Sequence, residues 1–291
     1  MSTMWCATIF ETADNRHMGP QNAPPKTPIP GVQYLVAIGS GKGGVGKTTV
    51  SVNLAIALTR MGRKVGLLDA DVYGPNVPLM MGTHETPMGH ADSIRPIEKY
   101  GVKLMSMGFL NPGDKPLVWR GPMLHSVIQQ FLRKVEWGEL DYLLIDLPPG
   151  TGDVALSLIQ SAPLSGAVVV TTPSDVSLED ARKAVNMFSQ VRVPILGMVE
   201  NMSYLIAPGS GERIDVFGQG GGKRTASDMG VPFLGELALD PDVRIGGDSG
   251  HPVTTRADGD KHAAPFLGLA ERLEQQCRQA QTPGPSVTIE D

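Results

Sequence analysis

The chain has 291 residues, of which 41% are hydrophobic, 19% charged and 5% aromatic, and this length permits one large α/β domain with a substantial buried core. Its formal net charge of -5 gives no electrostatic reason to expect nucleic acid or an anionic membrane as the main partner. The two cysteines, Cys6 and Cys277, suggest neither a disulfide framework nor a metal-spaced cluster, which fits a reducing, cytoplasmic compartment.

The order of predicted elements indicates a single α/β domain. Residues 1–30 are rich in Pro, Asn and Thr without apolar periodicity, and predict a flexible leader. Short β-type runs follow at 32–39, 65–69, 102–106, 142–146, 167–171, 195–200 and 233–237. Helical patterns occupy 47–61, 122–135, 154–162, 176–190 and 265–280. Repeated βα units predict a mostly parallel, doubly wound sheet with helices on both faces across 31–280, before a flexible tail at 281–291.

The last predicted helix has one apolar face, formed by Phe266, Leu269, Ala270, Leu273 and Cys277 at spacings of three and four. Its opposite face carries both signs of charge instead of being rich in Lys, so we expect it to pack on its own core and not on a membrane. Cys277 is then a core thiol. No stretch approaches 18 uninterrupted apolar residues.

A phosphate-binding loop follows the first predicted strand. The segment GKGGVGKTT satisfies the pattern GxxxxGK[ST] between a strand and a helix, and its residues are Gly41, Lys42, Gly43, Gly44, Val45, Gly46, Lys47, Thr48 and Thr49. Glycines let the backbone N–H groups surround phosphate oxygens, Lys47 neutralises β/γ charge and Thr48 supplies an oxygen to magnesium. The sequence therefore predicts a Mg-ATP site and an ATPase of the P-loop class.

Acidic residues end two of the predicted strands, at the edge of the sheet where doubly wound folds bind ligands. Asp69 and Asp71 close the second strand, and Asp146 closes the apolar run 142–146 as a Walker B acid does, so it is expected to reach magnesium through water. Gly150 begins a candidate switch loop and would offer its N–H to the γ-phosphate. Helix capping or turn formation is the alternative for each acid.

The motif KGGVGKTT resembles the deviant Walker A motif of the superfamily that contains MinD, ParA and the nitrogenase iron protein. This resemblance implies that Lys42 reaches the partner's nucleotide across a dimer, where an added cation stabilises charge in phosphoryl transfer. It also implies that Asp71 holds the attacking water, that Asp69 orients magnesium-bound water and that Asn201 reads adenine. A solvated loop lysine and a turn-forming asparagine are the alternatives for Lys42 and Asn201.

A closer resemblance links the chain to the Mrp, or ApbC-type, family of iron-sulfur cluster carriers, through the motifs LDADVYGP at 68–75, WRGPM at 119–123, DLPPGTGD at 146–153 and ENMSY at 200–204. It implies a homodimeric ATPase that passes clusters to apoproteins or works with cluster-assembly factors. In that family a Cys-x-x-Cys pair follows the last motif, whereas Ala207 and Ser210 stand here. Alanine has no donor atom and serine is a poor ligand for cluster iron.

Three functions remain open at this point. The first is an Mrp-type ATPase that supports iron-sulfur protein maturation, through unusual ligands or beside a cysteine-bearing partner. The second is a positioning or regulatory switch of the ParA/MinD kind, and the third is a scaffold paralogue that no longer binds a cluster. We expect no bridging cluster at Ala207 and Ser210, because thiolates are what hold cubane clusters together.

Overall fold

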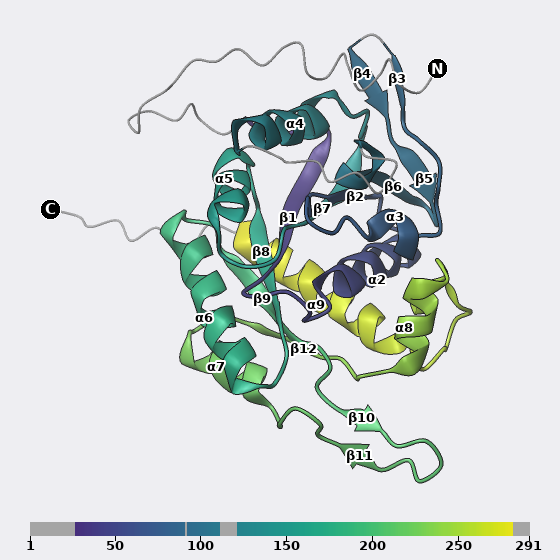
Figure 1. Cartoon of the computed structure of the whole chain (residues 1–291), viewed down its shortest axis with the longest axis vertical. Helices are drawn as coiled ribbons and strands as arrows, with labels where there is room; N and C mark the ends of the chain where they lie inside the picture. The colour runs from purple at the N-terminus through teal and green to yellow at the C-terminus, as the bar shows by residue number, and fades with distance from the viewer. Residues whose placement is uncertain (1–26, 91, 111–120, 282–291) are drawn as a thin grey trace, which may run out of the picture.

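An eight-stranded sheet forms the centre of the protein, which a computed structural model describes over residues 27–90, 92–110 and 121–281 (Figure 1). Its strand order is β12-β9-β8-β1-β7-β2-β6-β5, and only β5 and β6 pair antiparallel. The strands are β1 (Val32–Ser40), β2 (Val65–Asp69), β5 (Ile97–Lys99), β6 (Val102–Ser106), β7 (Leu140–Asp146), β8 (Gly166–Thr171), β9 (Ile195–Glu200) and β12 (Phe233–Glu236). The predicted fold class, a mostly parallel doubly wound sheet, is confirmed.

Helices cover both faces of this sheet (Figure 1). They are α2 (Lys47–Arg60), α3 (Val77–Met80), α4 (Gly121–Lys134), α5 (Asp153–Ser161), α6 (Asp175–Gln190), α7 (Gly221–Asp228), α8 (Pro241–Asp248) and α9 (Ala264–Gln281). Helices α4, α5 and α6 bury their apolar side chains in a core on one face, whereas α2 and α9 bury theirs in a second core on the other face. Each face of the sheet is therefore excluded from water, which explains why its central strands are apolar without alternation.

The apolar face of α9 is buried as predicted, from Phe266 to Cys277. Cys277 is 1% exposed, and burial raises the pKa of its thiol to about 12. A thiol that stays protonated at neutral pH is a poor nucleophile and metal ligand. The prediction of a core thiol is confirmed.

The sequence analysis did not predict several short elements. These are β5, α3, α7, α8 and two small hairpins, β3 (Met88–His90) with β4 (Ser93–Arg95) and β10 (Leu205–Ile206) with β11 (Arg213–Ile214). Strands of two or three residues are too short to show a period, and α7 begins with two glycines, which are poor helix formers. The leader up to residue 26, Cys6, Trp119 and the tail beyond residue 281 lie outside the described residues.

The strand order places three functional segments at one edge of the sheet. Strand β7 lies between β1 and β2, and the register pairs Asp146 with both Ile38 and Asp69. Because these strands are parallel, the loop after β1 and the acids that end β7 and β2 meet at their carboxyl ends. Residues separated by about a hundred positions in the chain thereby become neighbours.

Candidate functional site

The phosphate-binding loop between β1 and α2 depends on two glycines for its shape. A Cβ on Gly41 would lie 2.0 Å from the carbonyl oxygen of Asp180 in α6. Gly46 has a φ of 80°, and a Cβ there would lie 2.2 Å from Nδ2 of Asn201. At Gly41 the space admits no side chain, and at Gly46 both the space and the positive φ require glycine, so these glycines fix the loop against α6 and the segment after β9.

The loop forms the floor of a cavity of about 820 Å³. All the predicted nucleotide-binding residues from Lys42 to Thr49 line this cavity, together with Asp71 and Asn201. The opposite wall comes from segment 238–240 and from α8. Gly41, Asp69, Asp146 and Gly150 lie outside the lining, and Asp69 and Asp146 are fully buried behind it.

A buried cluster of charge lies beneath the loop. The ammonium of Lys47, a residue only 5% exposed, lies 2.8 Å from Oδ2 of Asp146 and 3.7 Å from Oδ2 of Asp71. The hydroxyl of Thr48 donates a hydrogen bond of 2.7 Å to Oδ2 of Asp146. A hydroxyl and a carboxylate oxygen therefore stand side by side, and oxygen donors of this kind are what Mg²⁺ prefers.

Ser51 completes the environment of Asp146, and the sequence analysis missed it. Its hydroxyl donates to Oδ1 of Asp146 at 2.6 Å, while Thr48 donates to Oδ2, so both carboxylate oxygens are held. Ser51 lies four residues after Lys47, which puts the two side chains on the same face of α2. That spacing was the available signal in the sequence. It does not predict the hydrogen bond to Asp146, because the sequence does not show that β7 lies beside α2.

Asp69 is held by the protein itself. Its Oδ2 accepts hydrogen bonds from Ser106 Oγ at 2.9 Å and from the N–H of Val77 at 3.2 Å, and its Oδ1 accepts one from the N–H of Asp71 at 3.1 Å. Burial, together with the nearby negative charge of Asp146, raises the pKa of the Asp69 carboxyl to about 8. In this structure Asp69 organises the turn after β2, and its role toward magnesium-bound water stays a prediction.

Asp71 lies nearer the cavity than Asp69. Its Oδ1 accepts hydrogen bonds from the N–H groups of Tyr73 at 3.1 Å and Gly74 at 3.3 Å, which directs Oδ2 toward Lys47. Burial raises the pKa of its carboxyl above the ordinary value, and the Lys47 ammonium opposes this shift. A carboxylate on the cavity wall suits the predicted contact with an attacking water.

The remaining predicted residues surround the loop. Lys42 lines the cavity and is half-buried. The Asn201 side chain donates from Nδ2 to the carbonyl oxygen of Val45 at 2.9 Å, and the N–H of Gly150 donates to the carbonyl oxygen of Ser40 at 3.0 Å. Both contacts brace the loop from outside, whereas adenine reading by Asn201 and a γ-phosphate contact from Gly150 stay predictions.

A family model described as "NUBPL iron-transfer P-loop NTPase" matches residues 31–274. The chain belongs to this family. The iron-sulfur cluster carrier protein of Aquifex aeolicus is 48% identical over 250 residues, which cover 85% of this chain and 69% of that protein. The carrier of Deinococcus radiodurans is 55% identical, with coverage of 77% and 64%, and the cluster transfer protein NUBPL of Dictyostelium discoideum is 46% identical, with coverage of 86% and 79%.

Solved structures support the same assignment for this NUBPL-family chain. A nucleotide-binding protein from Archaeoglobus fulgidus, described in complex with ADP and with cobalt, has a TM-score of 0.68 at 39% identity and covers 76% of this chain and 87% of its own. MinD of Pyrococcus horikoshii, complexed with Mg-ADP, has a TM-score of 0.63 at 27% identity, covering 86% of this chain and 99% of its own. The predicted resemblance to the Mrp family within the MinD/ParA superfamily is confirmed.

The family implies two inorganic groups, which the residues fit unequally. Magnesium fits, because the Thr48 hydroxyl and the Asp146 carboxylate are adjacent oxygen donors beside the loop. An iron-sulfur cluster as cargo does not fit the β10–β11 hairpin, where Ala207 has no donor and Ser210 is exposed, with its hydroxyl accepting from the N–H of Glu212 at 3.3 Å. Within the described ranges, no helix combines the length and apolarity needed to cross a membrane.

Proposed function

We propose that this NUBPL-family protein binds Mg-ATP at the loop 41–49, hydrolyses it as a homodimer in the cytoplasm, and supports the maturation of iron-sulfur proteins. The observation that carries the proposal is the convergence of Lys47, Thr48 and Asp146 beneath a cavity of about 820 Å³. An ammonium, a hydroxyl and a carboxylate at a helix N-terminus match what the phosphates and magnesium of a nucleotide require.

Each residue of the site has one task in this proposal. Lys47 exchanges part of its contact with Asp146 for the β- and γ-phosphates, while Thr48 and Asp146 hold magnesium, which when bound neutralises phosphate charge. Asp71 orients the attacking water. Lys42 of a second copy adds positive charge to the γ-phosphate, so hydrolysis depends on association. The N–H of Gly150 exchanges its hydrogen bond to the carbonyl oxygen of Ser40 for one to the γ-phosphate.

The role in iron-sulfur maturation rests on the relatives. The relatives from Aquifex aeolicus and Deinococcus radiodurans are named as iron-sulfur cluster carriers, and this chain covers 69% and 64% of their lengths. Because Ala207 and Ser210 supply no thiolate, we propose that the cargo is held with a cysteine-bearing partner or through other ligands. The partners are then apo iron-sulfur proteins or cluster-assembly factors, and neither nucleic acid nor membrane is proposed.

A positioning switch of the MinD kind is the second candidate, favoured by the likeness to MinD of Pyrococcus furiosus at a TM-score of 0.62 and 28% identity. The mixed charge on the outer face of α9 argues against a membrane-binding helix. Affinity capture from the native host separates the two: the maturation proposal predicts recovery of cluster-assembly proteins, and enrichment of division or partition proteins alone would contradict it.

The dependence of hydrolysis on a second copy of the chain is tested with Lys42→Ala. We expect this variant to bind a fluorescent ATP analogue as tightly as the wild type does. Its rate of phosphate release per subunit should no longer increase with protein concentration, since Lys42 acts on the neighbour's nucleotide. Lys134→Ala, at the exposed end of α4, is the matched control. Hydrolysis at the wild-type rate by Lys42→Ala would remove the cross-dimer role.

A further inference from the structure

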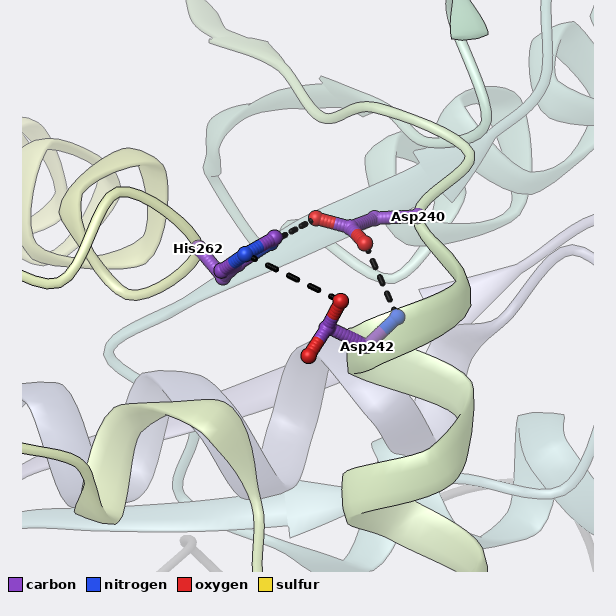
Figure 2. A group of neighbouring side chains, drawn as sticks. All are labelled: Asp240, Asp242 and His262. Carbon is purple, nitrogen blue, oxygen red and sulfur yellow. Dashed lines mark hydrogen bonds and ion pairs between the residues drawn. The ribbon is translucent and has the colours of Figure 1, made fainter. Parts of the chain in front are cut away.

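A second cavity, of about 800 Å³, lies between the β10–β11 hairpin and the start of α9. Segment 238–240 and Val243 line both this cavity and the nucleotide cavity, so the two share a wall. Apolar residues such as Leu205, Ile206 and Phe266 form much of its lining. Its polar lining includes the carboxylates of Asp240 and Asp242 and the imidazole of His262, which Figure 2 shows gathered at one point.

Asp240 fixes the orientation of the His262 ring. Its Oδ1 caps α8 by accepting from the N–H of Asp242 at 2.9 Å, and its Oδ2 contacts Nδ1 of His262 (Figure 2). A carboxylate at Nδ1 favours the tautomer with the proton on that nitrogen, which leaves a lone pair on Nε2. This is the arrangement by which proteins commonly orient a metal-binding histidine.

The free nitrogen then faces a second carboxylate. Nε2 of His262 lies 3.8 Å from Oδ2 of Asp242, beyond hydrogen-bonding distance (Figure 2). Two ligands that each lie ~2.1 Å from a tetrahedral ion are ~3.4 Å apart. A movement of a few tenths of an ångström by either half-buried side chain would therefore place both atoms on one ion.

The surrounding charge also favours a cation. Oδ1 of Asp242 pairs with Arg256 at 2.8 Å, which leaves Oδ2 available. The same guanidinium lies 3.7 Å from Asp260, whose Oδ1 accepts from the N–H of His262. Three carboxylates thus surround one guanidinium and one imidazole.

We propose that His262 Nε2 and Asp242 Oδ2 bind one first-row divalent transition-metal ion of the Zn²⁺ or Fe²⁺ class, with Asp240 positioning the imidazole. Mixed nitrogen and oxygen donors suit such ions and do not suit an iron-sulfur cluster. The remaining coordination positions face the cavity, where Ala207 and Pro208 form part of the wall. The inference does not depend on ATP hydrolysis or on cluster transfer.

The test is a titration of the full, nucleotide-free chain with Co²⁺, followed by visible ligand-field absorption. We expect the wild type to show saturable absorption at one equivalent. His262→Gln and Asp242→Asn should each weaken Co²⁺ binding by at least ~10-fold, and Asp240→Asn by ~10- to 100-fold through loss of the orienting carboxylate. Asparagine caps a helix as well as aspartate does, so Asp240→Asn should keep α8 folded.

His251→Gln is the matched control, because this exposed histidine also follows α8 and its ring contacts the carbonyl oxygen of Ser249 instead of a carboxylate. It should bind Co²⁺ like the wild type. Unfolding midpoints establish that each variant is folded, and binding of an ATP analogue reports separately on the nucleotide site. Absence of saturable absorption in the wild type, or wild-type Co²⁺ affinity in folded His262→Gln, would overturn the proposal. Asp240, Asp242 and His262 would then serve only to cap α8 and to form ion pairs.

Discussion

Removing the buried ammonium of Lys47 should destabilise the nucleotide-free protein as well as abolish ATP binding. Lys47 is 5% exposed and lies 2.8 Å from Asp146, which is fully buried, and 3.7 Å from Asp71. Lys47→Met keeps most of the side-chain volume but leaves these carboxylates without their cation. The change therefore tests charge balance more directly than a truncation to alanine would.

The expected magnitude follows from this geometry. Breaking a buried ion pair by removing one partner costs ~3–5 kcal/mol, because the remaining charge is left uncompensated. For a domain of this size each kcal/mol lowers the melting temperature by ~2–4 °C, so the expected decrease is ~6–20 °C. Thr48 and Ser51 still donate hydrogen bonds to Asp146 in the variant. We therefore expect a decrease in melting temperature near the lower end of this range.

The assay is chemical and thermal unfolding in nucleotide-free buffer with a chelator, repeated with excess Mg-ATP. With Mg-ATP at 100 times its dissociation constant, the free energy of unfolding of the wild type should rise by ~2.7 kcal/mol. That of Lys47→Met should not change. Lys42→Met is the control, since Lys42 is half-buried and has no ion pair among the described residues. An unchanged unfolding midpoint for Lys47→Met, or an equal loss for Lys42→Met, would refute the charge-balance reasoning.

Three further predictions concern the acids and the hairpin. Asp71→Ala should keep Mg-ATP affinity but slow hydrolysis in single-turnover measurements, and lost affinity with normal turnover per bound ATP would contradict its role. The pKa of Asp69 is raised from 3.8 to about 8, so the folded state binds the proton more tightly and nucleotide-free stability should fall as pH rises through that window. Asp69→Asn should flatten this trend in urea midpoints, and an unchanged slope would exclude Asp69 as its source. Reconstitution with iron and sulfide should give little charge-transfer absorbance in the wild type and clear absorbance in the double variant Ala207→Cys/Ser210→Cys; stoichiometric cluster on the wild type would show that other ligands hold it.

Much of the fold was predictable because its signals are local. Uninterrupted apolar runs such as 167–170 mark strands buried on both faces, and the amphipathic spacing from Phe266 to Cys277 marks α9. The loop 41–49 was equally clear, since its glycines, lysine and threonines are consecutive in the chain. The residues that determine each of these features lie close together in the sequence, so a short segment is enough to predict it.

The contacts around Asp146 and Asp69 were settled only by the tertiary structure. The sequence placed both acids at strand ends, but not the donation from Ser51 to Asp146 or from Ser106 to Asp69, because each pair joins separate elements. The strand order, which puts β7 between β1 and β2, decides which of these side chains meet. That order depends on packing across the whole sheet and leaves no periodic trace in any one segment.

What the sequence determined by itself was the P-loop chemistry and the loss of thiolates at Ala207 and Ser210, since both follow from residue identity at fixed short spacings. Only the tertiary structure brought His262 to Asp240 and Asp242 and placed all three in the lining of the second cavity. These residues belong to a helix start and to a loop about twenty positions later. Their meeting depends on how α8 and α9 pack on the sheet, a long-range effect that no local pattern encodes.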